Sequence, residues 1–166
     1  MTIAAPVLLA SNHKLDAFDC GVLPLDDWLK RRARNNALSG ASHTYVACMG
    51  TTVVGYYALA AGGVEVGMAP GRFRRNMPDP IPVVVLGRLA IDRTQQGRGL
   101  GRALFRDASL RVLQAADIIG VRGILVDAIS DRAKSFYEAL GMMVSPIDSM
   151  TLMVTLAELR VSLATP

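Results

Sequence analysis

The spacing of hydrophobic positions changes along this chain, and each change predicts a different kind of element. Residues 24–40 repeat apolar side chains at helical intervals, with acidic residues near the start and basic residues further along, as the helix dipole favours. Residues 43–49 and 51–61 are rich in Val, Tyr and Thr on either side of Gly50. This composition predicts two strands joined as a β-hairpin.

The rest of the chain alternates between strand-like and helix-like periods. Residues 62–82 hold several glycines and prolines, and we expect them to be mostly loop. The near-continuous apolar run at 83–91 predicts a central strand covered on both faces. The remaining pattern predicts, in order, a helix over 100–116, a strand over 123–128, a helix over 131–140 and a strand over 150–156.

This order of elements indicates an α/β or α+β fold, with a mixed central sheet and helices on both of its faces. The length of 166 residues suits one domain spanning residues 1–166, and 51% hydrophobic residues provide ample material for a core. No run approaches the roughly 20 apolar residues of a membrane span, and the start lacks a secretion signal, so we expect a cytoplasmic protein. Cys20 and Cys48 are expected to be reduced and buried.

The formal net charge of +4 comes from two short segments. Residues 24–40 hold four basic and two acidic side chains, and residues 71–79 hold three arginines and one aspartate. Acidic and basic residues balance in the rest of the chain. This distribution indicates a polyanionic partner such as a nucleic acid, and the alternative is an ordinary solvated helix face.

A glycine-rich segment between the strand at 83–91 and the helix at 100–116 carries the clearest chemical signal. Residues 96–101 read QGRGLG, and the amide hydrogens of such a turn, together with the helix dipole, favour an anion. Glycines let the backbone approach a pyrophosphate, and Arg98 and Arg102 add positive charge. A Rossmann motif would need glycine at position 102, and a Walker A motif would need Gly-Lys before Ser or Thr, so both are excluded.

Two motifs in this order resemble the signature of the GNAT acetyltransferases. The pattern Gln96-x-x-Gly99-x-Gly101 follows an apolar strand, and residues 135–141 read SFYEALG, which is similar to the FYExxG segment of that superfamily. Longer stretches resemble one GNAT branch, the tRNA-acetylating toxins. They include PGRFRRNMPDPIPVVVLGRLAIDR and GRALFRDASLRVLQAADIIGVRGILV, and the similarity extends over about residues 18–156.

The resemblance implies an enzyme that transfers the acetyl group of acetyl-CoA to an amine without a metal. Proteins of this branch are typically homodimers that acetylate the free α-amine of aminoacyl-tRNA and so block translation. Each is typically held inactive by a small ribbon-helix-helix antitoxin from the same operon. Aminoacyl-tRNA, such an antitoxin and a second copy of the chain are therefore the implied partners.

The resemblance also implies roles for individual residues. Tyr137 is the implied general acid that protonates the departing thiolate of coenzyme A, and the alternative is a core tyrosine with a satisfied hydroxyl. An amide N–H near residues 89–91 would polarise the thioester carbonyl. The implied acetyl-CoA-binding residues are Leu89, Ala90, Ile91, Gln96, Gly97, Arg98, Gly99, Leu100, Gly101, Arg102 and Ser130.

The basic segments supply candidates for contact with tRNA phosphates. These candidates are Lys30, Arg31, Arg34, Arg72, Arg74 and Arg75. The sequence offers no obvious strong general base. This favours an α-amine, which is neutral in about one molecule in six at pH 7, over a lysine, which is neutral in about one in 2,500.

Four positions depart from the pattern of the toxin branch. Relatives often have arginine at His43, histidine at Asp127 and phenylalanine at Met142, and Ser130 replaces the general GNAT asparagine. One alternative function is an acetyltransferase that acts on a protein amine or a small-molecule amine. Another is a non-enzymatic scaffold, against which the intact glycine-rich motif and Tyr137 both argue.

Overall fold

The structure is a computed structural model that describes residues 2–164, and the chain forms two compact units. Unit 1 comprises Met1–Ala60 and Gly87–Ala108, and unit 2 comprises Ala61–Leu86 and Ser109–Pro166. Three long elements have residues in both units, namely β3 (Thr52–Val64), β4 (Ile81–Ile91) and α4 (Leu100–Ala116).

Unit 1 contains the hairpin that the sequence predicts. β1 (Val7–Leu8) pairs antiparallel with β2 (His43–Met49), and β2 pairs antiparallel with β3. Gly50 in the hairpin turn has a φ of 63°, a left-handed value that glycine adopts without strain.

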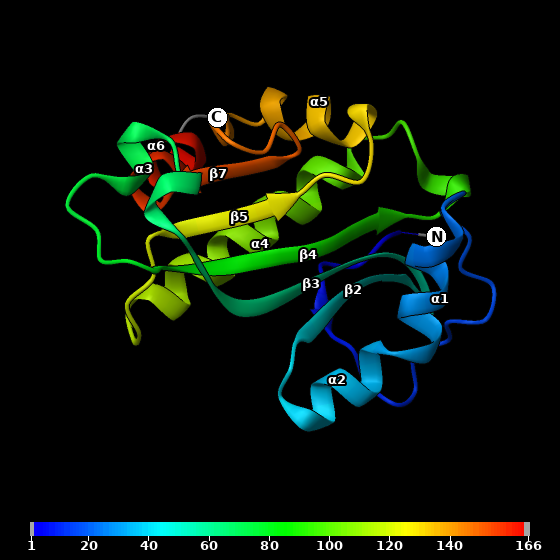
Figure 1. Cartoon of the computed structure of the whole chain (residues 1–166). Helices are drawn as coiled ribbons and strands as arrows, with labels where there is room; N and C mark the ends of the chain where they lie inside the picture. The colour runs from blue at the N-terminus through cyan, green and yellow to red at the C-terminus, as the bar shows by residue number, and fades with distance from the viewer. Residues whose placement is uncertain (1, 165–166) are drawn as a thin grey trace. The chain divides into compact units, whose positions relative to one another are not determined.

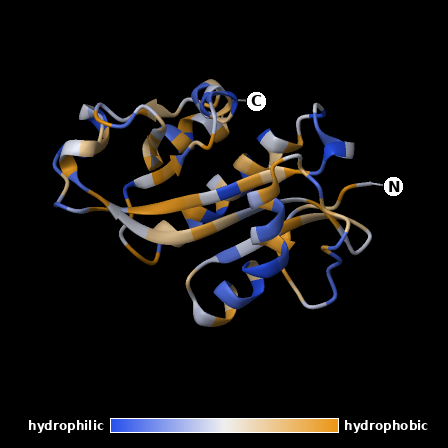
Figure 2. Cartoon of the chain, turned by 45° about the vertical axis from the view of Figure 1, so that its right-hand side comes forward, coloured by the Kyte–Doolittle hydropathy of each residue, from blue (hydrophilic) through white to orange (hydrophobic). Residues whose placement is uncertain are grey.

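The helix predicted over 24–40 is divided in two. α1 (Leu23–Arg31) and α2 (Ala33–Ser39) meet at Arg32, whose φ of −119° interrupts the helical geometry. Neither proline nor glycine marks this break, so the hydrophobic period contains no sign of it. Figure 1 shows both helices beside β2 and the first part of β3, and Figure 2 shows that many of their positions are hydrophilic.

An aromatic cluster forms the core of unit 1 beneath α1. The Trp28 and Tyr56 rings are stacked, with centroids 6.0 Å apart and an interplanar angle of 9°. Phe18 meets Tyr56 edge to face at 5.5 Å. The Tyr56 hydroxyl donates a hydrogen bond of 2.6 Å to the carbonyl of Leu25, so the buried phenol is satisfied and α1 is fixed to the sheet.

Helices cover both faces of the sheet within unit 1. Tyr56 points to α1, whereas a Cβ added at the preceding Gly55 would lie 3.2 Å from Leu104 and 3.3 Å from Leu100 of α4. Successive residues of a strand point to opposite faces, so α1 and α4 lie on opposite sides of β3. This agrees with the predicted architecture.

Both cysteines are buried in unit 1 as free thiols. Burial, reinforced by a hydrogen bond and the charge of Asp26, raises the pKa of the Cys20 thiol to about 11. Burial also raises the pKa of Cys48. At neutral pH both thiols are therefore protonated.

Unit 2 carries the mixed part of the sheet. β4 runs parallel to β5 (Gly123–Asp127), and β5 pairs antiparallel with β7 (Thr151–Thr155). β7 pairs antiparallel in turn with β6 (Met143–Val144). The strand order is β1-β2-β3-β4-β5-β7-β6.

The expectation of loop over residues 62–82 is only partly correct. β3 continues to Val64, a 3-10 helix forms at Val66–Met68, and α3 (Gly71–Arg74) follows. β4 then begins at Ile81, before the predicted start at residue 83. A second helix of unit 2, α5 (Asp131–Ala139), closely matches its prediction.

The chain continues past the last predicted strand into a helix that the sequence analysis missed, α6 (Leu156–Ala164). A capping box starts it. The Thr155 hydroxyl accepts from the backbone N–H of Glu158 at 3.1 Å, and the Glu158 carboxylate accepts from the N–H of Thr155 at 3.0 Å. The Thr-x-x-Glu pattern at 155–158 was the available signal.

The central strand β4 is buried at Val83, Val84 and Leu86, but Gly87 is exposed. Ala90 is buried again further along, and the residues between Gly87 and Ala90 are half-buried, so Gly87 is the one exposed residue of this strand. No helix within residues 2–164 has the length and apolarity needed to cross a membrane.

The close contact between β5 and β7 predicts a large loss of stability from one small substitution. A Cβ at Gly123 would lie 1.9 Å from the carbonyl oxygen of Val154, so Gly123→Ala must force the two strands apart. We expect it to lower the free energy of unfolding by about 3 kcal/mol in urea titrations. Gly120→Ala, where a Cβ meets nothing within 4 Å, is the matched control, and equal stability of the two variants would contradict this account.

Candidate active site

The glycine turn (residues 96–102) joins a 3-10 helix at Arg93–Gln95 to α4 in unit 1. Gly97 and Gly99 have φ angles of 77° and 81°, which residues with a Cβ adopt only at a cost. A Cβ at either position would meet nothing within 4 Å. Backbone conformation, and not crowding, is thus the reason for glycine, and the space beside the turn is open.

The backbone N–H groups of the turn are available to a ligand. The N–H of Ala103 donates to the carbonyl of Gly99 at 3.1 Å. For the preceding N–H groups, those of residues 97–102, the described part of the chain offers no acceptor. Such groups at a helix N-terminus, next to the exposed Arg98 and Arg102, form an anion site of the kind that a pyrophosphate requires.

Gln96 holds the turn in place. Its Nε2 donates to the carbonyl of Cys20 at 2.9 Å and to the carbonyl of Ile91 at 2.8 Å. The side-chain amide nitrogen is therefore committed to the protein, and its action on a ligand is indirect. The first residue of the motif positions the backbone that follows it.

Asp92, which the sequence analysis did not single out, fixes the corner between the end of β4 and the glycine turn. Its carboxylate accepts from the N–H of Asp19 at 2.9 Å and from the N–H and hydroxyl of Thr94 at 3.1 and 2.6 Å. Burial acts to raise the pKa of Asp92, but these hydrogen bonds and the charge of Arg93 outweigh it and lower the pKa. The Asp-x-Thr sequence before the glycines was the signal for this cap.

The strand segment implied to bind acetyl-CoA, residues 89–91, also lies in unit 1. Ala90 is buried in the cluster that contains Trp28, whereas the Ile91 side chain approaches Gly55 on the α4 side. Leu89 is half-buried. The bond from Gln96 to Ile91 brings this segment together with the glycine turn.

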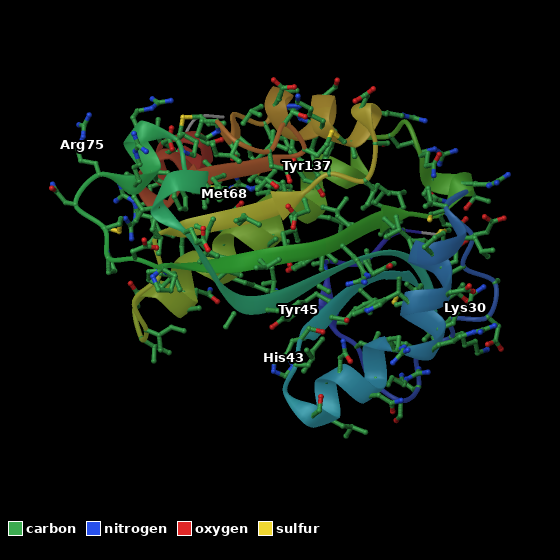
Figure 3. All side chains as sticks on the ribbon, viewed as in Figure 1. Lys30, His43, Tyr45, Met68, Arg75 and Tyr137 are labelled. Carbon is green, nitrogen blue, oxygen red and sulfur yellow. The ribbon has the colours of Figure 1, made fainter. Side chains whose placement is uncertain are left out.

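Tyr137 lies in α5 of unit 2 (Figure 3), and Ser130 directly precedes this helix. Tyr137 is 7% exposed and meets Phe136 edge to face at 5.1 Å, and burial raises the pKa of its phenol to about 12. Ser130 is the N-cap of α5 and accepts from the N–H of Ala133 at 3.1 Å. Serine and asparagine cap helices about equally well, so this replacement preserves the helix start.

The basic residues of unit 1 differ in their availability. Lys30 and Arg31 are exposed in the last turn of α1, and Figure 3 shows Lys30 at the outer side of that helix. Arg34 donates to the carbonyls of Ala10 and His13 at 3.3 and 2.8 Å, so it also ties α2 to the N-terminal segment.

The basic residues of unit 2 also differ in their availability. Arg72 lies 3.5 Å from the carboxylate of Glu158, whereas the side chains of Arg74 and Arg75 are exposed and make no hydrogen bond or ion pair within residues 2–164. Figure 3 shows Arg75 projecting away from the segment after α3. Arg122 donates to the carbonyls of Phe73 and Arg72 at 2.8 and 2.7 Å and so anchors α3, a role that the sequence did not reveal.

The other residues that depart from the toxin pattern are Asp127, His43 and Met142. Asp127 accepts from the Thr151 hydroxyl at 2.6 Å across β5 and β7. His43 is exposed at the start of β2, and Met142 is buried. Within residues 2–164 no group of three or more His, Cys, Asp or Glu side chains could hold a metal ion.

Comparison with known proteins agrees with this geometry. The family model described as an acetyltransferase (GNAT) domain matches residues 40–141. The tRNA-acetylating toxin of Mycobacterium tuberculosis is 48% identical over 157 residues, which is 95% of each chain.

Two solved structures extend the similarity to the fold. AtaT complexed with acetyl-methionyl-tRNAfMet superimposes with a TM-score of 0.89 at 27% identity, covering 96% of this chain and 98% of that one. A tyrosine-to-phenylalanine mutant of AtaT, bound to the C-terminus of the antitoxin AtaR and acetyl-CoA, has a TM-score of 0.84 at 26% identity, covering 99% and 100%.

The chain therefore belongs to the GNAT acetyltransferases and is an acetyl-CoA-dependent N-acetyltransferase. Within that family it belongs to the tRNA-acetylating toxins of toxin-antitoxin systems. The open glycine turn, with its free amide hydrogens and flanking arginines, fits the diphosphate of acetyl-CoA.

The conformation of the turn predicts the effect of a single methyl group. Gly99→Ala places a Cβ on a residue with a φ of 81°, which costs about 1–2 kcal/mol when the turn is formed. We expect the Kd for acetyl-CoA to rise about tenfold in calorimetry. Gly71→Ala, at a site with open space and no left-handed φ, should leave the Kd unchanged, and equal affinities of all three proteins would contradict the assignment.

Proposed function

We propose that this chain is a toxin that acetylates the free α-amine of aminoacyl-tRNA and thereby blocks translation. The observation that carries the proposal is the 48% identity, over 95% of both chains, to a protein named as a tRNA-acetylating toxin. The likeness to AtaT, solved with acetyl-methionyl-tRNAfMet, supports the same acceptor class.

The residues of unit 1 bind and orient the donor in this proposal. Acetyl-CoA supplies the activated acetyl thioester when it is bound. The N–H groups of residues 97–102 hold its diphosphate, and Arg98 and Arg102 balance the charge. A backbone N–H among Leu89, Ala90 and Ile91 donates to the thioester carbonyl and stabilises the negative charge that develops there.

Tyr137 supplies the proton for the leaving thiolate in this proposal. A phenol whose pKa is raised to about 12 is protonated throughout the neutral range, as a general acid must be. Transfer to a thiolate of ordinary pKa, about 8.5, is uphill by roughly 5 kcal/mol. The transfer therefore has to accompany the breaking of the carbon–sulfur bond, when the sulfur is most basic.

The acceptor amine needs little help from the protein. An α-amine of pKa near 7.7 is neutral in about one molecule in six at pH 7 and can attack directly. The proton that it loses after attack can pass to water. This favours aminoacyl-tRNA over a lysine acceptor.

The exposed cations are the part of the surface suited to tRNA phosphates. Four basic side chains are exposed and make no hydrogen bond or ion pair within the described residues, namely those of Lys30, Arg31, Arg74 and Arg75. Arg34 and Arg72 already make contacts inside the protein and contribute less. Phosphate contacts of this kind give affinity without sequence readout.

The regulation of the toxin belongs to the same proposal. AtaT has been solved with the C-terminus of its antitoxin AtaR, which supports neutralisation of this chain by a cognate antitoxin. The ribbon-helix-helix type of that antitoxin is implied by the resemblance to the toxin branch. Homodimerisation and action in the cytoplasm, where aminoacyl-tRNA is found, complete the proposal.

Mass spectrometry of total aminoacyl-tRNA after incubation with acetyl-CoA tests the acceptor. We expect N-acetyl-aminoacyl-tRNA to accumulate, with no acetylation of uncharged tRNA. Parallel reactions with peptides and polyamines separate the alternative acceptors. Acetylation of those amines, with aminoacyl-tRNA left unmodified, would overturn the proposed function and leave the acetyltransferase class intact.

We expect removal of the Tyr137 hydroxyl to lower turnover selectively. Tyr137→Phe retains the buried ring, so the acetyl-CoA Kd and the melting temperature should stay within error of the wild type. We expect kcat to fall by roughly 10²-fold or more. Unchanged kcat would remove Tyr137 from the mechanism.

The pH profile provides the control for this variant. Because the pKa of Tyr137 is about 12, its deprotonation cannot lower the wild-type rate between pH 7 and 10. A fall in rate over that range that disappears in Tyr137→Phe would show that Tyr137 titrates between pH 7 and 10, which would contradict a pKa near 12.

Charge reversal after α3 should weaken tRNA binding without affecting the donor. We expect the double variant Arg74→Glu, Arg75→Glu to bind tRNA more weakly, with a salt slope smaller by about one for each lost phosphate contact. Its acetyl-CoA Kd should match the wild type. Arg160→Glu, an exposed residue on α6, is the control, and equal salt slopes in both variants would rule out a specific role for Arg74 and Arg75.

A further inference from the structure

Arg88 of β4 is held flat against an aromatic ring in unit 1. Its guanidinium carbon lies 4.4 Å from the centroid of the Trp28 ring, a cation–π distance. Trp28 is stacked on Tyr56, whose hydroxyl is bonded to the carbonyl of Leu25. The guanidinium is thus the outermost group of a stack that begins with Tyr56 in the core.

The N–H edges of the Arg88 guanidinium have no hydrogen-bond or ion-pair partner among residues 2–164. The residue is half-buried. Arginine stays charged at every physiological pH, and its five donors match the oxygens of a phosphate or carboxylate. A pre-oriented, partly desolvated cation without an anion is suited to an anionic ligand.

The position of Arg88 on β4 indicates which anion its guanidinium binds. Ala90, two residues along β4, packs in the Trp28 cluster, whereas Ile91 faces Gly55 and α4. Arg88 therefore lies on the α1 face of the strand, opposite the face covered by α4, whose N-terminus carries the glycine turn. An anion bound by Arg88 would lie on the face of β4 opposite to the helix that carries the diphosphate site.

We propose that Arg88, positioned by Trp28, binds the phosphodiester next to the aminoacylated nucleoside of the tRNA, an inference that rests on the proposed function. Arg88 directly precedes residues 89–91, the segment assigned to the thioester. The anion of the acceptor nearest to its reactive amine is this phosphodiester. Peptides and polyamines lack it, so the contact distinguishes aminoacyl-tRNA from other amines.

The test compares three acceptors that carry the same amino acid. They are aminoacyl-tRNA, a stable 3′-amide aminoacyl-adenosine, and the same analogue with a 5′-phosphate. For Arg88→Gln we expect kcat/KM to fall about 10- to 100-fold with the two phosphate-bearing acceptors and to be unchanged with the phosphate-free analogue. The acetyl-CoA Kd should remain at the wild-type value.

Two further variants make the result specific. Arg88→Lys keeps the charge but loses the planar fork, so we expect a loss smaller than that of Arg88→Gln. Arg106→Gln removes an exposed arginine of α4 and should match the wild type with all three acceptors. Melting temperatures confirm that each variant is folded.

Several outcomes would overturn the inference. Equal losses with and without the phosphate would make Arg88 a structural residue, and a raised acetyl-CoA Kd would assign it to the donor. Unchanged kinetics in Arg88→Gln would leave it no role in acceptor choice. Failure of the wild type to acetylate aminoacyl-tRNA would instead reject the proposed function itself, and the wild-type reaction alone reveals that case.

Discussion

The corner at the end of β4 is the constraint on which the donor site depends. The carbonyl of Ile91 accepts from Gln96, and the Asp92 carboxylate accepts from Asp19 and Thr94. These bonds fix where α4 begins and therefore where the free amide hydrogens of the glycine turn point. The hydrogen bonds that lower the pKa of Asp92 outweigh the burial that would raise it, so the carboxylate stays charged and the corner stays closed at neutral pH.

Strand β4 separates two kinds of electrostatic surface within unit 1. On the α4 side the positive potential comes from backbone dipoles, Arg98 and Arg102, and it suits the compact diphosphate of a nucleotide cofactor. On the α1 side it comes from long side chains, of which Arg88 is fixed by an aromatic ring and Lys30 and Arg31 are free. Under the proposed function, this strand would keep acetyl-CoA and tRNA apart while bringing their reactive ends together.

The sequence predicts most of the fold because its strong periods are reinforced by turn residues. The hairpin around Gly50, the long helix α4 and the helix that begins after Ser130 all match local patterns of apolar, glycine and capping residues. The break at Arg32 was not predictable because neither proline nor glycine marks it. The anchoring of α3 by Arg122 was not predictable because it joins segments distant in sequence. In the site the glycine motif was readable, but the supporting role of Asp92 and the stacking of Arg88 on Trp28 appear only in three dimensions.

The burial of Cys20 and Cys48 has a consequence for how the protein responds to oxidative stress. These are the two cysteines of the sequence, and the thiolate, which is the form that peroxides and disulfides attack, is scarce in both because burial raises their pKa. Neither thiol is therefore suited to sense oxidants. Redox control that works through cysteine would have to act on the partners of the toxin or on its synthesis.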